Sequence, residues 1–75
     1  MTIEKPVYSG IVDSACGNGF FKVNVHFSDN DKEVIVCQLS GKMRTKNIKV
    51  VGGDRVEVEM DPYDLRKGRI TFRNR

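Results

Sequence analysis

Alternating apolar and polar residues dominate this chain, and a period of two predicts β-strands. Residues 19–28, GFFKVNVHFS, show the pattern most clearly. One face of that segment carries Phe21, Val23, Val25 and Phe27, and the opposite face carries Phe20, Lys22, Asn24 and His26. Successive side chains of a strand point to opposite faces, so the first set is expected to face a core.

Four more segments have the composition of strands. Residues 33–39, EVIVCQL, are apolar on both faces as far as Gln38, which indicates a place within the sheet rather than at its edge. Residues 55–60 and 69–73 alternate again, and the side chains expected to face inward from them are Val56, Val58, Met60, Ile70 and Phe72. Residues 7–15 complete the set, with a bend or bulge expected at Gly10.

Turn-forming residues separate these segments. Residues 28–31, SDND, and 52–54, GGD, are predicted turns, and residues 61–68 are expected to form a loop broken by Pro62. Ser40 is placed to cap a short helical turn over residues 42–45. We therefore expect an all-β fold, a five-stranded OB-fold barrel with a short helical turn between strands 3 and 4. An SH3-like barrel, which also has five strands, is the alternative.

The chain of 75 residues is expected to form one domain over residues 1–75, with residues 1–6 as a disordered N-terminus. No apolar run is long enough to cross a membrane, and the N-terminus does not resemble a secretory signal. Cys16 and Cys37 lack the spacing of metal ligands, so we expect no metal and no cofactor. Reduced thiols in a cytoplasm are expected, and a disulfide only if the fold brings both cysteines together.

Catalysis finds little support in the residue pattern. His26 is the one histidine, and it has no acid or nucleophile at a recognisable spacing. Gly41 and Lys42 lack the rest of a phosphate-binding loop. Only a fold that brought a cysteine beside His26 would create an activated nucleophile, so the protein is not expected to be an enzyme.

The net charge of +3 is unevenly distributed. Residues 1–40 carry three cations and five acids, whereas residues 41–75 carry ten cations and five acids. Two segments of the second half contain no acid, and their cations are Lys42, Arg44, Lys46, Lys49, Arg66, Lys67, Arg69, Arg73 and Arg75. Such clustering predicts a basic surface for a polyanion, with nucleic acid as the leading candidate.

Two uncharged side chains bear on this prediction. Phe20 shares a strand face with Lys22, where an exposed ring could stack on a base; alternatively it caps one end of the barrel. Met43 lies between Lys42 and Arg44 in the helical turn, where successive residues are about 100° apart. Met43 then either faces the barrel or meets an unstacked base as an apolar wedge.

A resemblance to a known family sharpens this interpretation. Residues 40–44, SGKMR, and 53–75, GDRVEVEMDPYDLRKGRITFRNR, resemble the C-terminal half of the bacterial translation initiation factor one family, and GIV at Gly10 and FKV at Phe21 match its first half more loosely. The resemblance implies a non-enzymatic OB-fold protein that binds the small ribosomal subunit at the aminoacyl site of the decoding region. It also implies contact with rRNA, a block on premature tRNA entry, and cooperation with the other initiation factors.

Carried over by position, the resemblance implies specific RNA contacts. The implied residues are Lys42, Met43 and Arg44 in a turn that inserts into RNA, with Met43 as the wedge, then Lys49, Arg66, Lys67, Arg69 and Arg73. Secondary candidates are Phe20, Lys22, Lys46 and Arg75. Asn47 departs from the family, in which tyrosine is common at this position. The free protein is expected to be a monomer without membrane contacts.

The alternative function is that of a cold-shock-like chaperone that binds any single-stranded RNA. Such proteins display several aromatic side chains on strands 2 and 3. Here only Phe20 is available on the outward face of strand 2. This difference favours the initiation factor.

Overall fold

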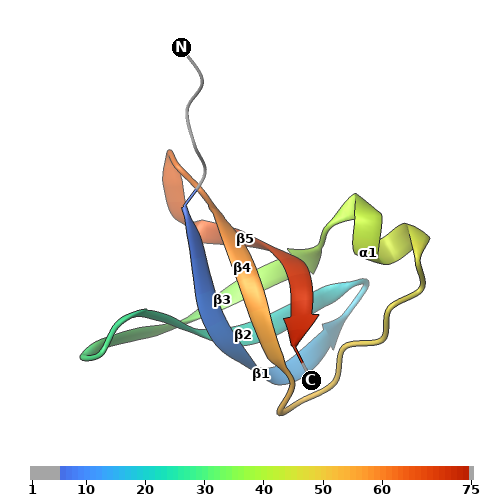
Figure 1. Ribbon diagram of the computed structural model, residues 1–75, viewed down its shortest axis with the longest axis horizontal. Helices are drawn as coiled ribbons and strands as arrows, with labels where there is room; N and C mark the ends of the chain where they lie inside the picture. Colours follow the sequence, from blue (N-terminus) through green and yellow to red (C-terminus); the bar gives the residue numbers. More distant parts are fainter. Residues whose placement is uncertain (1–5, 75) are drawn as a thin grey trace.

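The computed structural model describes residues 6–74 and, within that range, every side chain except that of Leu65. Five strands form a closed barrel in the order β1-β2-β3-β5-β4 (Figure 1). The elements are β1 (Val7–Gly17), β2 (Phe20–Ser28), β3 (Asp31–Leu39), α1 (Gly41–Thr45), β4 (Arg55–Asp61) and β5 (Asp64–Asn74). The predicted OB-fold barrel with a helical turn between strands 3 and 4 is confirmed.

One short parallel ladder closes the barrel. Residues 36–39 of β3 pair in parallel with residues 67–70 of β5, whereas every other pair of neighbouring strands is antiparallel. Beyond the barrel, the β2–β3 hairpin extends as an arm, seen in green at the left of Figure 1. The ladder at 36–39 therefore joins the arm-bearing part of the sheet to the β4–β5 hairpin.

The inward faces of the strands fill a core that α1 and the loop after it complete. Its buried apolar residues are Val12, Phe21, Val23, Val25, Ile35, Cys37, Met43, Val50, Val56, Val58, Met60 and Ile70. Phe27 is half-buried at its margin and makes an edge-on contact with Tyr8, with ring centroids 4.8 Å apart. The alternation predicted for residues 20–27 and 55–60 is thus confirmed, with Phe27 less buried than the rest.

Gly68 brings β5 directly onto this core. A Cβ atom added at Gly68 would lie 2.8 Å from Cγ1 of Val58 and 3.0 Å from Sγ of Cys37. The first separation is shorter than real Cβ contacts allow, and the second is tighter than most of them. The absence of a side chain at this position therefore sets how closely β5 approaches β3 and β4.

The outer half of β5 departs from the predicted alternation. Ile70 is fully buried, but Phe72 is 54% exposed, so the expectation that Phe72 faces inward is wrong. The cause is a β-bulge: Val58 pairs with Ile70 and Glu57 pairs with Phe72, which leaves Thr71 as an extra residue on β5. One extra residue reverses the direction of the side chains that follow it.

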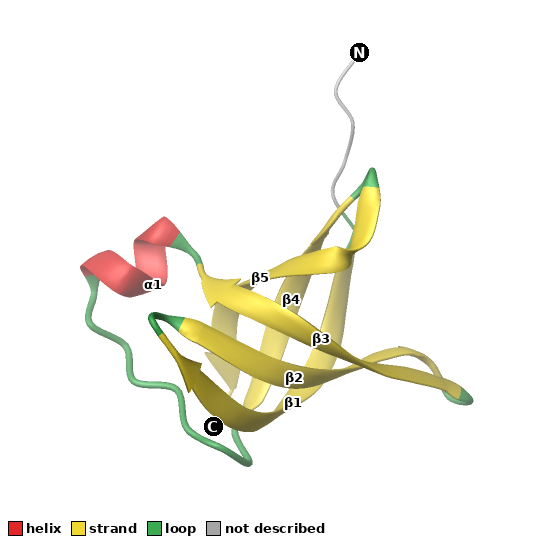
Figure 2. Ribbon diagram, turned by 180° about the vertical axis from the view of Figure 1, so that it is seen from behind, coloured by secondary structure: helices red, strands yellow, loops and turns green. Residues whose placement is uncertain are grey.

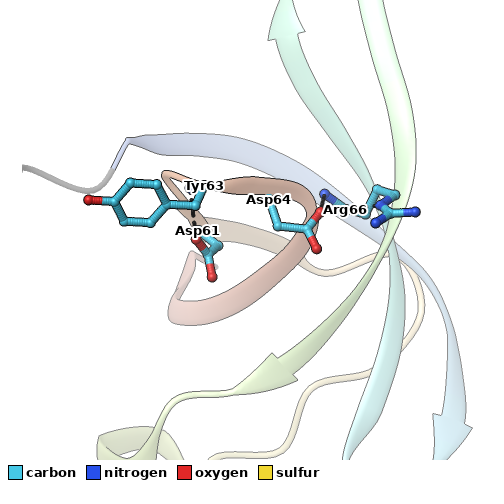
Figure 3. A network of polar contacts seen from close by, with 4 residues as sticks. All are labelled: Asp61, Tyr63, Asp64 and Arg66. Atoms are coloured by element: carbon cyan, nitrogen blue, oxygen red, sulfur yellow. Dashed lines mark hydrogen bonds and ion pairs between the residues drawn. The ribbon is translucent and has the colours of Figure 1, made fainter.

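The predicted loop over residues 61–68 is also wrong, because the strands continue through it. β4 ends at Asp61 and β5 begins at Asp64, so the turn is only Pro62 and Tyr63. The Asp61 carboxylate accepts a hydrogen bond from the backbone N–H of Tyr63 at 2.8 Å (Figure 3). Proline is tolerated in this turn because no ladder hydrogen bond is required of it there.

Smaller expectations have mixed outcomes. The predicted turns at 28–31 and 52–54 are present. On β1 the ladder irregularities lie between Val12 and Ser14 and between Ala15 and Gly17, rather than at Gly10. The proposed disordered segment 1–6 lies outside the described residues except for Pro6, whose carbonyl accepts a hydrogen bond from the backbone N–H of Met60 at 2.8 Å.

Candidate nucleic-acid interface

The helical turn α1 begins with the predicted cap. Ser40 Oγ accepts a hydrogen bond from the backbone N–H of Met43 at 3.3 Å, and the Ser40 N–H donates to the carbonyl of Ile70 at 2.9 Å. The second bond docks the start of α1 on β5. With that docking, Met43 points into the barrel and is only 2% exposed.

The burial of Met43 overturns its assignment as an apolar wedge against RNA. A side chain that already belongs to the core has almost no free surface to offer a base. Lys42 and Arg44 on either side of it are exposed. The turn therefore presents its two cations outward and keeps its thioether inside.

Two rows of exposed side chains cross the outer surface of β2, β3 and β5. In one row Lys22 pairs with Val36 and Val36 with Lys67; in the next, Phe20 pairs with Gln38 and Gln38 with Arg69. We call these six residues the sheet face. Neighbouring strands lie about 4.8 Å apart, so the backbones of Lys22 and Lys67 are roughly 10 Å apart across β3.

The sheet face mixes cations with apolar groups. Lys22, Lys67 and Arg69 are exposed, Phe20 is 38% exposed and Val36 is 47% exposed. The position of Phe20 opposite Gln38 places its ring on the outer surface of the sheet. A surface of this composition can bind phosphates through its cations and contact bases through its apolar atoms.

A second basic site lies between α1 and the end of β5, and Figure 2 shows α1 beside the part of the barrel that carries β5. It is a groove of about 380 Å³, here called the Phe72 groove, lined by Lys42, Met43, Lys46, Ile48, Thr71, Phe72 and Arg73. Residues from the two acid-free segments, 42–49 and 66–75, meet in it. Phe72 could not be recognised as a site residue from the sequence, because nothing in RITFR reveals the bulge at Thr71.

Hydrogen bonding fixes part of this second site. The guanidinium of Arg73 donates a hydrogen bond to the backbone carbonyl of Lys49. This bond ties the end of β5 to the loop that follows α1. Arg73 has five N–H donors, so others remain for a phosphate, while the Lys49 side chain itself is exposed.

Two predicted cations are members of neither surface. A Cβ atom added at Gly19 would lie 3.7 Å from Nη2 of Arg44, which places that guanidinium over the β1–β2 turn. At the β4–β5 turn, Nε of Arg66 lies 3.2 Å from Oδ1 of Asp64 (Figure 3). Arg75, a secondary candidate, lies outside the described residues.

The carboxylate of Asp64 partly neutralises the charge of Arg66. It accepts hydrogen bonds from the backbone N–H and the side chain of Arg66, and these bonds hold the pKa of Asp64 below its ordinary value. The acid therefore remains ionised beside the cation. Of the predicted cations in the C-terminal segment, Arg66 is thus a weaker candidate for a phosphate contact than Arg69.

The geometry gives no support to a cysteine–histidine pair. Cys37 pairs with Phe21 and faces the core, whereas His26 lies five residues further along β2, roughly 16 Å away along the strand. Both cysteines are free thiols, Cys16 exposed and Cys37 buried, and burial raises the pKa of Cys37 to about 12. Within residues 6–74, no three His, Cys, Asp or Glu side chains gather as metal ligands.

No helix in the part of the chain that the structure describes is long or apolar enough to span a bilayer.

Comparison with known proteins gives consistent matches over almost the whole chain. The model of the family described as translation initiation factor 1A / IF-1 matches residues 4–75. The solution structure of translation initiation factor IF-1 from the Wolbachia endosymbiont strain TRS of Brugia malayi has a TM-score of 0.72 and 38% identity, covering 93% of this chain and 78% of that one.

Two larger proteins contain a similar barrel. The crystal structure of YjeQ from Thermotoga maritima matches with a TM-score of 0.72 and 33% identity over 93% of this chain. YloQ, described as a circularly permuted GTPase, matches with a TM-score of 0.74 at 23% identity, also over 93% of this chain, and shows the fold alone. The present chain spans only 23% of each of those proteins.

Proposed function

The chain belongs to the translation initiation factor 1A / IF-1 family, and from this premise we propose that it binds the small ribosomal subunit at the aminoacyl site of the decoding region. There it contacts rRNA, blocks premature entry of tRNA and cooperates with the other initiation factors. The observation that carries this proposal is the sheet face, on which three cations flank exposed apolar side chains.

The proposed mechanism is electrostatic and steric. Lys22, Lys67 and Arg69 hold the RNA backbone, because ammonium and guanidinium groups form charge-assisted hydrogen bonds to phosphate oxygens. Lys42 and Arg44 extend the cationic surface to the helical turn. Once bound, the barrel occupies space that tRNA would otherwise fill, so the function needs no catalytic group. We place the free protein in the cytoplasm as a monomer.

Co-sedimentation with purified small subunits tests the proposal. The double variant Lys67→Ala/Arg69→Ala should bind more weakly than the wild type at every salt concentration. Each phosphate contact contributes about 0.7 to the slope of log affinity against log salt for single-stranded nucleic acid. The loss of two contacts should reduce that slope by about 1.4.

Lys32→Ala is the matched control, because Lys32 is exposed on the β2–β3 arm outside the sheet face. Its affinity and salt slope should equal those of the wild type. If the double variant and the control behave alike, the sheet face is not the binding surface. If the wild type does not sediment with small subunits, the proposed function is wrong.

The alternative function, a chaperone of single-stranded RNA, would use exposed aromatic side chains to stack on bases. Tyr63 in the β4–β5 turn and Phe72 on β5 expose aromatic rings in addition to Phe20. On β2, Phe20 is still the one exposed ring, so the comparison made from the sequence stands for that strand. Equal affinity for unstructured RNA and for small subunits would favour the chaperone over the initiation factor.

A further inference from the structure

The β2–β3 arm leaves one edge of β3 without a neighbouring strand. The parallel ladder between β3 and β5 begins at Val36 and Lys67, so residues 31–35 have no partner strand on that side among the described residues. On the opposite side of the arm, β1 pairs with β2 out to His26. Both views show the tip of the arm standing clear of the β4–β5 turn (Figure 1, Figure 2). We call residues 31–35 of β3 the open edge.

Backbone groups along the open edge are available for pairing. Alternate residues of a strand direct their N–H and C=O groups to opposite sides, so roughly two or three of these five residues present theirs outward. Within residues 6–74, no backbone hydrogen bond from a loop or turn reaches them. The side chains of residues 31–34 are exposed, that of Val34 by 59%. An exposed edge of this kind is a template for a further strand.

The tip of the arm is an acidic part of a basic protein. Residues 29–33 carry three acids and one cation, a balance of −2, whereas the whole chain has a net charge of +3. All four charged side chains are exposed, and none forms an ion pair with another described residue. They are Asp29, Asp31, Lys32 and Glu33. The tip of the arm therefore repels a phosphate backbone and attracts a cationic ligand.

A second copy of the chain fits the open edge poorly. Adjacent antiparallel strands related by a two-fold axis place one residue opposite its own counterpart. The register that uses all five residues of both edges is centred on Glu33 and brings two carboxylates together. A register centred on Lys32 brings two ammonium groups together and places Asp31 opposite Glu33. Like charges directly opposite each other destabilise a strand pair, so the partner is a different chain.

We propose that the open edge of β3 is a docking site for an extended, lysine- or arginine-rich segment of a partner protein, which adds to the sheet as a further strand. Main-chain hydrogen bonds supply the affinity of such a complex, and side chains select the partner. Asp31 and Glu33 share one face of β3, so the partner carries its cations on that face. This interaction goes beyond the proposed RNA binding, because it uses a part of the surface that repels RNA.

The docking site and the sheet face can be occupied together. The open edge ends at residue 35, whereas the sheet face begins at Val36 and includes Lys22 and Lys67 on its two sides. A strand added to the arm lies beside β3 rather than over the outer surface of the sheet. RNA and the protein partner are therefore expected to bind one molecule without competing.

Amide hydrogen exchange tests the docking site with a synthetic heptapeptide of alternating lysine and valine. The peptide should slow exchange at the outward amides of residues 31–35, which belong to alternate residues, and leave the amides of β1 unchanged. A heptapeptide of alternating glutamate and valine is the matched control, and it should not protect the open edge. Equal protection by both peptides would overturn the proposal.

Methylation of the peptide backbone separates strand addition from simple charge attraction. In an added strand, alternate N–H groups of the peptide face β3 and the others face solvent. Methylation of one alternate set of nitrogens in the lysine peptide should abolish binding, and methylation of the other set should leave it unchanged. Equal binding by the two methylated peptides would show that no strand is added, and the proposal would then be wrong.

Reversal of one charge on the open edge tests the choice of partner. Glu33→Lys replaces an attraction between exposed cross-strand charges with a repulsion of similar size, so the lysine peptide should bind about 2- to 30-fold more weakly. Asp13→Lys makes the same change of charge at an exposed position of β1 and should bind the peptide as the wild type does. Equal losses in the two variants would contradict charge selection at the edge.

Two further measurements reveal a different occupant. If a hexamer of adenylate RNA protects the open edge and the lysine peptide does not, the edge binds RNA. If a rise in protein concentration alone protects it, the occupant is a second copy. Either result overturns the basic partner. Co-sedimentation with small subunits tests the proposed function separately, so a failure of the docking site is distinguishable from a failure of ribosome binding.

Discussion

Truncating Met43 distinguishes a core residue from an RNA-contacting wedge. Met43 is 2% exposed and packs with the buried residues of the barrel, so Met43→Ala leaves a cavity beneath α1. Substitutions of this kind cost about 2–5 kcal/mol. A domain of this size rarely has more than about 3–5 kcal/mol from its core. The variant should therefore lose most of its stability.

The expected shift in melting temperature is large enough to measure without ambiguity. A change of 1 kcal/mol moves Tm by about 4–8 °C in a domain of about 60–100 residues. A loss of about 3 kcal/mol then corresponds to a fall of roughly 12–24 °C, which circular dichroism would record. RNA binding should be retained at temperatures well below the new Tm.

Two control variants frame this experiment. Met43→Leu keeps the volume of the side chain and should cost less than about 1.5 kcal/mol. Val51→Ala removes methyl groups from a side chain that is 58% exposed, so its effect should stay within about 0.5 kcal/mol. The reasoning is refuted if Met43→Ala melts like the wild type and yet loses RNA binding, because that result describes a wedge.

Three further predictions concern Gly68 and the two cysteines. Gly68→Ala should destabilise the barrel by about 1–3 kcal/mol in urea unfolding, because the new methyl group would meet Val58 and the sulfur of Cys37; an unchanged midpoint would show that β5 is free to move away. In the folded protein, iodoacetamide should alkylate Cys16 and leave Cys37 unmodified in a peptide mass spectrum, because Cys37 is buried. The folded pKa of Cys37 is about 12, above its ordinary value of 9.0, so this group's contribution to stability is complete below pH 9 and declines as the pH rises towards 12. The urea midpoint should fall over that range, and the part of the fall due to Cys37 should vanish in Cys37→Ala.

Much of the barrel could be predicted from local pattern. Val56, Val58 and Met60 alternate with charged residues, and each of the three is buried. The helical turn could be predicted because Ser40 is a favourable cap whatever the rest of the chain does. In these cases the local preference and the tertiary structure agree.

The predictions that were wrong concern side chains whose direction depends on strand pairing and tertiary contacts. Ile70 and Phe72 have the spacing of a shared face, and only the pairing of β5 with β4 introduces the bulge that separates them. Met43 has charged neighbours on both sides, so its direction depends on where Ser40 meets β5. Pro62 indicated a loop, but a two-residue turn accommodates it without breaking either strand.

The sequence predicted which segments carry the positive charge of the candidate site, but not how their side chains are arranged in space. The acid-free segments could be read from the sequence, and their meeting at the Phe72 groove required only that β5 end beside α1. Which cations share a surface could not be read in this way. Lys22 and Lys67 become neighbours across Val36 only through the parallel ladder between β3 and β5.

If RNA lies across the sheet face as we propose, it also stabilises this ladder. Its four residue pairs make it the shortest of the described barrel's five ladders, and a strand of RNA lying from Lys22 to Lys67 passes over it. A ligand that binds only the closed barrel adds about 2.7 kcal/mol at a concentration about one hundred times its Kd. RNA bound in the proposed way would therefore hold the barrel closed, and the protein should resist heat and proteolysis better with RNA than without it.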